Sequence, residues 1–275
     1  MTRRHTMASG DKYFLGHSFT EQRRLQQQAE DLAADSIWLF DQLRLSPGSR
    51  VVEIGCGPQG CLEILAERVG QTGSVVGVEM SEEAVALARA FVAQRQLGQV
   101  DVRQRDAKAT GLPRNTFDLA TARLVLVNVP EPEAIVTEMA RLVKPGGVVA
   151  LHEADWEMVF CDPPLPAWNR MIQAFLDYSK ANAIDPLIGR RIARLLRTSG
   201  LTNIRINPFI HIYDVNHSRR TLLPQFAGNL RDRMLANRIM VEREFEACRQ
   251  SIERHLADPD TVVMWAYFQA WGTKP

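Results

Sequence analysis

VVEIGCGPQG, residues 51–60, is the stretch of sequence that decides the fold of this 275-residue chain. An apolar run enters a turn with three spaced glycines, and residues 61–68 continue with apolar side chains at helical spacing. The pattern predicts a buried strand, a tight turn and a helix N-terminus, where bare backbone and free N–H groups let a ligand approach. Glu53 lies two residues before Gly55, at the carboxyl end of the strand, where open α/β sheets bind ligands.

Strands and helices alternate beyond this turn. We expect strands over 74–78, 100–104, 117–122 and 148–151, and helices over 81–96 and 131–143. Glu79 follows the second strand and Asp106 follows the third, so both carboxylates are expected at the same edge of the sheet as Glu53. Alternation of this kind predicts an α/β fold with a doubly wound, mostly parallel sheet.

Two further regions flank a core of residues 50–154. Residues 1–49 are interpreted as an N-terminal helical extension, because an apolar stripe at helical spacing runs from Ser18 to Leu43. Residues 155–275 are interpreted as the rest of the sheet with a helical substrate cap. Its parts are expected at about 155–185 and 218–257, with a helix over 188–198 and strands over 202–213 and 261–271. The second part of this cap, at about 218–257, is therefore a helical lid inserted before the last strand.

The composition argues against several classes of protein. The chain is 45% hydrophobic, enough for one large domain with a sizeable core, and its formal net charge of +1 provides no field to attract nucleic acid or a membrane surface. No apolar run reaches the length of a membrane span, and none follows the basic start to form a secretory signal. The four cysteines have no spacing typical of zinc or disulfides, which predicts a cytoplasmic protein without a metal site. Association into a homo-oligomer is left open.

Five motifs occur in one order along the chain. They are Glu53-Ile54-Gly55-Cys56-Gly57, Glu79, Arg105-Asp106-Ala107, Phe117-Asp118 and the turn at residues 142–147, LVKPGG. Together they resemble the class I S-adenosylmethionine-dependent methyltransferases, and most closely the small-molecule enzymes of quinone-biosynthesis and natural-product type. The resemblance covers residues 13–154 and the closing strand near 269–272. It implies a Rossmann-like core, S-adenosylmethionine as cofactor and S-adenosylhomocysteine as product.

The resemblance also implies a set of cofactor-binding residues: Glu53, Gly55, Cys56, Gly57, Glu79, Met80, Asp106, Ala107 and Arg123. Glu79 is expected to accept hydrogen bonds from both ribose hydroxyls, and Asp106 from the adenine amino group beside the Ala107 N–H. Met80 is expected to pack on adenine, and Arg123 to face the methionine carboxylate. Glu53 is expected to organise the loop. A purely structural cap for Glu53 and a salt bridge for Arg123 are the alternatives.

Methyl transfer mainly needs an aligned acceptor, and a base is required only if the acceptor must lose a proton. His152, at the end of the fifth predicted strand, is interpreted as that base or as an acceptor-orienting group, with Tyr13 closing over donor and acceptor. Glu153 and Asp155 are expected to orient substrate or to face solvent. Substrate-binding roles are predicted for His17, Trp156, Trp168, Phe175 and Phe226. Packing inside the protein is the alternative for each of them.

The predicted function is methylation, at carbon or oxygen, of an apolar small molecule such as a terpenoid, a polyketide or an aromatic compound, with ring closure as an additional step left open. One alternative is a cyclase or auxiliary protein that binds the cofactor without transferring methyl. Another is a nicotinamide-dependent oxidoreductase, since Gly55, Gly57 and Gly60 match its fingerprint. A pyrophosphate would be repelled by a carboxylate as near as Glu53, which disfavours this second alternative.

Overall fold

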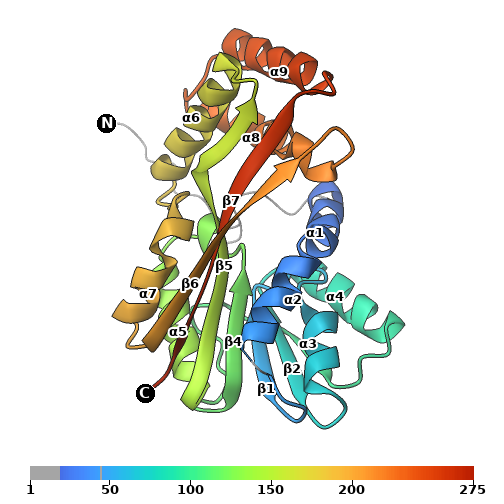
Figure 1. Cartoon of the computed structure of the whole chain (residues 1–275), viewed down its shortest axis with the longest axis vertical. Helices are drawn as coiled ribbons and strands as arrows, with labels where there is room; N and C mark the ends of the chain where they lie inside the picture. Colours follow the sequence, from blue (N-terminus) through green and yellow to red (C-terminus); the bar gives the residue numbers. More distant parts are fainter. Residues whose placement is uncertain (1–18, 44) are drawn as a thin grey trace.

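A sheet of seven strands forms the centre of the computed structural model, which describes residues 19–43 and 45–275 (Figure 1). The strands lie in the order β3-β2-β1-β4-β5-β7-β6. Their bounds are β1 Arg50–Ile54, β2 Ser74–Glu79, β3 Val100–Gln104, β4 Phe117–Arg123, β5 Val143–Asp162, β6 Thr202–Tyr213 and β7 Val262–Thr273. The first five run parallel, and β7 is antiparallel to both of its neighbours. The predicted doubly wound, mostly parallel sheet is confirmed.

Helices cover both faces of this sheet. Their bounds are α1 Phe19–Asp31, α2 Ala33–Gln42, α3 Leu62–Val69, α4 Glu82–Gln94, α5 Pro132–Leu142, α6 Pro166–Ala181, α7 Ile192–Thr198, α8 Leu222–Ala236 and α9 Glu242–Leu256, with short 3-10 turns η1 Leu126–Asn128, η2 Ile188–Arg191 and η3 Ser218–Thr221. Successive residues of β1 face opposite sides, so Val51 packs with α2, α3 and α4 while Val52 packs with the core around α5 and α7. Because both faces are covered, residues 51–54 are buried without the polar alternation of a solvent-facing strand.

The helices α6, α8 and α9 gather at one end of the sheet, around the extended parts of β5 and β7 (Figure 1). Aromatic rings fill this region. Trp156 of β5 stacks on Phe175 of α6 with ring centroids 3.7 Å apart, and it meets Phe226 and Trp265 edge to face. The aromatic residues of the predicted cap therefore form a packed core, and the helices between β6 and β7 lie where a lid was expected.

Three boundaries differ from the predictions. The helix expected from Ser18 to Leu43 is two helices, separated at Leu32. The strand expected over 148–151 is the 20-residue β5, because pairing with β7 continues from Val148 to Asp162. The helical stretch 218–257 is divided by a turn between α8 and α9. Long-range pairing and packing decide all three boundaries, and neither is visible in local sequence patterns.

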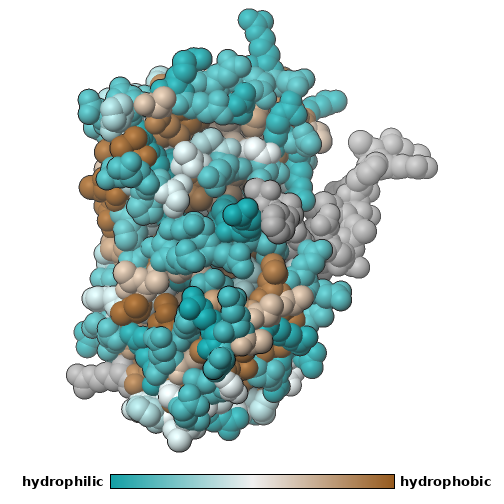
Figure 2. Space-filling view, turned by 90° about the vertical axis from the view of Figure 1, so that its right-hand side faces the viewer, coloured by the Kyte–Doolittle hydropathy of each residue, from teal (hydrophilic) through white to brown (hydrophobic). Residues whose placement is uncertain are grey.

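The face of the molecule in Figure 2 is mostly hydrophilic, with separate apolar patches. No helix within the described residues is long and apolar enough to cross a membrane. The cytoplasmic location, the absence of nucleic-acid partners and the boundaries of the three regions stay predictions.

Candidate functional site

A cavity of about 300 Å³ opens at the carboxyl ends of β1, β2 and β4. Its walls come from the glycine turn after β1, the end of β2, the loop after β3, the segment after β4 and the helix α1. Every residue predicted to bind the cofactor lines this cavity: Glu53, Gly55, Cys56, Gly57, Glu79, Met80, Asp106, Ala107 and Arg123. The structure thus brings together side chains spread over some 70 residues of sequence.

The turn after β1 requires glycine at two of its positions. Gly55 and Gly60 have φ values of +67° and +53°, in the left-handed region that other residues rarely adopt. A Cβ atom at Gly60 would lie 2.6 Å from the Cys56 carbonyl oxygen and 2.7 Å from the Glu53 carboxylate. At Gly55 it would lie 2.5 Å from the Val125 side chain. The glycine spacing in the sequence therefore reflects both backbone conformation and close packing.

Glu53 fixes the glycine turn to the start of α3. Its buried carboxylate accepts a bifurcated hydrogen bond from the Cys61 N–H, at 2.9 and 3.0 Å, and Cys61 is the N-cap residue of α3. Burial raises the pKa of Glu53 to about 7, although Arg123 and the Cys61 N–H act in the opposite direction. The contact is of the loop-organising kind expected for this residue, and a role toward a bound ligand stays a prediction.

Glu79 joins the first turn to the second. One carboxylate oxygen accepts from the Gly57 N–H at 3.1 Å, and the other accepts from the N–H groups of Met80 and Ser81 at 2.7 and 2.9 Å. A carboxylate offers about four acceptor positions, so three backbone donors leave room for a further donor from the cavity. These contacts hold the side chain at the cavity wall before any ligand arrives.

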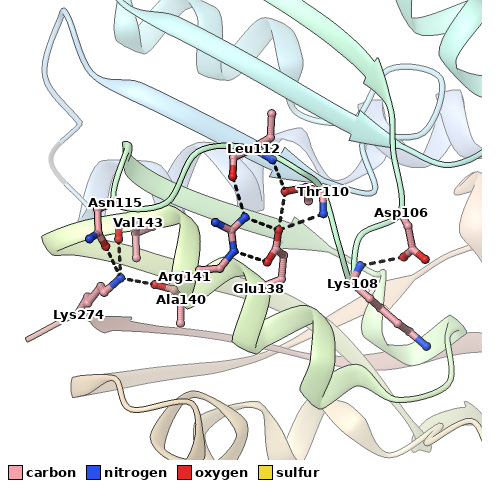
Figure 3. A network of polar contacts seen from close by, with 10 residues as sticks. All are labelled: Asp106, Lys108, Thr110, Leu112, Asn115, Glu138, Ala140, Arg141, Val143 and Lys274. Atoms are coloured by element: carbon pink, nitrogen blue, oxygen red, sulfur yellow. Dashed lines mark hydrogen bonds and ion pairs between the residues drawn. The ribbon is translucent and has the colours of Figure 1, made fainter.

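The loop after β3 is anchored by an ion pair whose carboxylate is buried. Glu138 of α5 accepts from the Thr110 N–H at 3.0 Å and from its hydroxyl at 2.5 Å, and it pairs with Arg141 at 2.7 Å (Figure 3). The Arg141 hydrogen bonds hold the pKa of Glu138 below its usual range. Asp106, at the start of the same loop, accepts from the Lys108 N–H at 2.9 Å (Figure 3). The network thus keeps the Asp106 carboxylate at the cavity.

Arg123 connects the N-terminal helices to the glycine turn, a role that the sequence did not predict. Its guanidinium donates to the Ser36 hydroxyl at 2.8 Å and to the Gly60 carbonyl at 3.2 Å. Contact with a ligand carboxylate stays a prediction. The helix α1 also contributes Gln22, Leu25 and Gln28 to the cavity wall. Gln22 and Gln28, on the same helix as Leu25, are the sequence feature that could have indicated this wall of the cavity.

A second cavity of about 30 Å³ adjoins the first, because Gln28 and Leu124 line both. Trp156 and Phe226, two of the predicted substrate residues, line this smaller cavity. Trp168 and Phe175 line neither cavity, and both are core side chains. Trp168 is fully buried and donates to the Val159 carbonyl at 3.2 Å, while Phe175 is covered by Trp156. For Trp168 and Phe175, the packing alternative is the one that this geometry supports.

The His152 side chain lines neither cavity. It is 1% exposed, its ring meets Phe209 and Tyr267 edge to face, and neither ring nitrogen has a hydrogen-bond partner among the described residues. Burial, with Arg123 and Arg219 nearby, lowers the pKa of His152 well below its usual range. Its role as a base therefore stays a prediction that this position does not support. Tyr13 and His17 lie outside the described residues.

Glu153 and Asp155 are buried structural carboxylates, so the expectation that they orient substrate or face solvent is wrong. Glu153 accepts from the N–H groups of Val125, Leu126 and Val127 at 2.8–3.2 Å, which fixes the segment after β4. Asp155 pairs with Arg190, including a contact of 2.8 Å. No group of three or more His, Cys, Asp or Glu side chains that could hold a metal occurs among residues 19–43 and 45–275.

Comparisons with known proteins agree with the motifs. Residues 52–151 match the methyltransferase domain family. An uncharacterized 37.1 kDa protein of Streptomyces fradiae is 30% identical over 64% of this chain, which spans only 50% of that relative. The demethylmenaquinone methyltransferase of Bacillus cereus is 28% identical, over 62% of this chain and 79% of its own length. This chain spans 60% of the length of several further relatives.

The fold also matches solved structures. Phosphoethanolamine N-methyltransferase 2 of Haemonchus contortus, solved with S-adenosylhomocysteine, superposes with a TM-score of 0.52 at 16% identity. The match covers 94% of this chain and 53% of that enzyme, and at this identity it supports the fold alone. The resemblance stated from the motifs is confirmed over residues 52–151.

Proposed function

Because residues 52–151 form a methyltransferase domain, we propose that the chain is an S-adenosylmethionine-dependent methyltransferase acting on an apolar small molecule. One observation carries the proposal. Four carboxylates, three cationic side chains, a glycine turn and an exposed methionine meet around one cavity at the carboxyl ends of parallel strands. This set suits a ligand that has a positive charge, a ribose diol and an adenine ring but no phosphate.

The residues of the cavity have separate tasks in this proposal. Glu79 faces the ribose diol and keeps one acceptor position open for a hydroxyl, because three backbone N–H groups fix its carboxylate at the wall. Asp106 receives the adenine amino group, the Ala107 N–H lies beside the same ring, and Met80 covers it. Arg123 faces the carboxylate of the methionine part. Glu53 acts through the turn, since its own carboxylate is occupied by the Cys61 N–H.

S-adenosylmethionine supplies a methyl group on a positively charged sulfur. A lone pair of the acceptor bonds to the methyl carbon while the carbon–sulfur bond breaks and its electron pair stays on sulfur. The chain contributes mainly by holding the acceptor in line with that bond and by excluding water. Leu124 lines both cavities, so the acceptor is expected to pass this residue to reach the methyl group.

The walls near Leu124 indicate the class of acceptor. Val125, Val129 and Ile135 line the first cavity there, and Trp156 and Phe226 line the second. Such walls favour an apolar secondary metabolite such as a terpenoid, polyketide or aromatic compound, methylated at carbon or oxygen. Ring closure coupled to the transfer stays part of the proposal, to be distinguished by the product.

The test combines the full chain with S-adenosylmethionine that is labelled in its methyl group and with a panel of apolar metabolites. We expect label in a product whose mass has increased by one methylene unit, and binding of S-adenosylhomocysteine by calorimetry. An isomerised product without label would support the cyclase alternative instead. Binding of a nicotinamide dinucleotide without binding of S-adenosylhomocysteine would contradict the proposal.

A further inference from the structure

The wall of the second cavity includes a buried cation that has no counter-ion among the described residues. Arg219 of η3 is 3% exposed and lines this cavity. Its guanidinium donates to the Tyr213 hydroxyl at 3.1 Å and to the Tyr267 hydroxyl at 2.6 Å. No carboxylate of the part of the chain that the structure describes lies within ion-pair distance of it. Buried arginines normally have an acidic partner, so a cavity wall with an uncompensated guanidinium indicates a negatively charged ligand.

Hydrogen-bond donors exceed acceptors around this guanidinium. The hydroxyls of Tyr213 and Tyr267 both accept from Arg219 and lie 3.3 Å apart, so only one of them donates to the other. The second hydroxyl hydrogen has no acceptor among the described residues. Trp265, which also lines the cavity, has a buried Nε1–H with no hydrogen-bond partner in residues 19–43 and 45–275. A ligand with acceptor oxygens would satisfy these donors.

The other polar side chains of this cavity do not supply the missing negative charge. Arg24 is neutralised by Glu21, at 2.6 Å, and donates to the Gln28 side-chain oxygen at 2.9 Å. Asn128 uses its side-chain N–H on the Leu124 carbonyl. No aspartate or glutamate among the described residues lines the second cavity. Its positive charge therefore comes from Arg219.

We propose that Arg219 and Trp265 bind an anionic oxygen group of the acceptor, either a carboxylate or a phenolate. This rests on the proposed function, because it treats the second cavity as part of the acceptor site. A volume of about 30 Å³ exceeds the 10–15 Å³ that one water requires, so the cavity suits a carboxylate or the oxygen end of a phenolate whose ring remains outside it. The body of the acceptor then extends past Leu124 into the larger cavity.

The anchor would determine which acceptor atom meets the methyl group. Arg219 is held in place by two phenol oxygens and by the faces of Tyr213, Trp265 and Tyr267, whose ring centroids lie 5.7–5.9 Å from the guanidinium carbon. A fixed cation binds an anionic group in one orientation and at one distance from Leu124. Arg219 is thus a specificity-determining residue, and small acids are favoured over neutral compounds of the same shape.

The experiment compares matched anionic and neutral probes by calorimetry on the full chain, with and without S-adenosylhomocysteine. The carboxylate pair is 2-naphthoate and 2-naphthamide, and the phenolate pair is 4-nitrophenolate and 4-nitroanisole. We expect the anion of at least one pair to bind about tenfold more tightly than its neutral partner, and the better pair identifies the group. Arg219→Met should abolish this preference, Arg219→Lys should retain part of it, and Trp265→Phe should weaken it a few-fold.

Arg220→Met is the matched control. Arg220 is also 3% exposed and has no acidic partner among the described residues, but it lines neither cavity and donates to the Asp258 carbonyl at 2.5 Å. The control should leave the preference unchanged. If Arg219→Met does not fold, Arg219→Lys and Trp265→Phe provide the test.

Two results would overturn the inference: equal binding of both members of each pair by the unmodified chain, or a preference that survives Arg219→Met. If the anion preference is retained but S-adenosylhomocysteine does not bind, the proposed function fails while the anion site stands. If S-adenosylhomocysteine binds and the preference is missing, only the anion site fails.

Discussion

The two neighbouring cavities differ in the charged side chains of their walls. The larger one carries both signs, with Glu53, Glu79, Asp106 and Glu131 beside Arg105, Lys108 and Arg123, whereas the smaller one has Arg24 and Arg219 and no carboxylate among the described residues. In the proposed function, the first cavity holds the cationic donor and the second holds an anionic group of the acceptor. Because the sulfonium charge would disappear on methyl transfer, the attraction between the two bound reactants would be stronger before the reaction than after it.

The cavities also differ in how they are built. Carboxylates of the larger cavity are each fixed by backbone N–H groups within a few residues of a strand end, as with Glu79 and Ser81. The walls of the smaller cavity come from α1, η1, β5, η3, α8 and β7, and Arg219 is held by side chains of β6 and β7. Substitutions in the larger cavity should therefore change nucleoside binding without affecting the selection of anionic probes.

The largest effect is expected from Glu79→Ala. Loss of a carboxylate that accepts from ribose hydroxyls, and that also holds the Gly57 N–H, should weaken S-adenosylhomocysteine binding several hundredfold, or by about 3.5 kcal/mol. Calorimetry measures the affinity, after thermal unfolding has confirmed that the variant folds. Glu83→Ala, at an exposed position in the first turn of α4, is the control and should bind normally. Unchanged affinity in Glu79→Ala would remove this carboxylate from the nucleoside site.

A slightly smaller effect is expected on stability, from Glu53. The carboxyl group has a pKa of about 7 when folded and 4.5 as its ordinary value, so between these pH values the folded chain holds a proton that the unfolded chain has lost. The stability that Glu53 contributes is therefore complete below pH 4.5 and is lost as the pH rises through about 7. At about 1.4 kcal/mol per pH unit, the loss is about 3 kcal/mol.

Urea unfolding of the wild type and of Glu53→Gln across this pH range measures the loss. The amide oxygen of the variant can still accept from the Cys61 N–H, but the side chain does not titrate. The free energy of unfolding of the wild type should fall relative to the variant from pH 4.5 to 7 and then stay level. A difference independent of pH would mean that Glu53 titrates as an exposed carboxyl does, and that the larger cavity is better solvated than its burial indicates.

The smallest effect is expected from Asp106→Ala. One hydrogen bond to the adenine amino group should be lost, so affinity for S-adenosylhomocysteine should fall about tenfold. The inosine analogue lacks that amino group. The wild type should therefore bind it more weakly than S-adenosylhomocysteine, whereas the variant should bind the two nucleosides equally well. Asp101→Ala, on the exposed side of β3, serves as the control. A variant that still discriminates between the two nucleosides would show that another group reads the adenine edge.

Strand-end motifs made the larger cavity predictable. The predicted sheet is confirmed, and the nine residues predicted to bind the cofactor line one cavity, because a parallel α/β sheet brings the carboxyl ends of its strands to one edge. The length of β5 was underestimated, since its extension from 152 to 162 depends on pairing with β7, more than 100 residues away. Trp168 was assigned to substrate because aromatic composition alone does not distinguish a core ring from a cavity wall.

The sequence by itself determined the sheet, the glycine turn and the carboxylates around it, because each depends on residues that are neighbours in the chain. Only the tertiary structure decided that Glu153 fixes a backbone segment, that His152 is enclosed by aromatic rings and that Arg219 has no counter-ion within the part of the chain that the structure describes. These properties depend on which distant side chains arrive beside a residue. Burial and ion pairing determine the free energy of a charged group in the folded protein, and neither is encoded in the local spacing of residues.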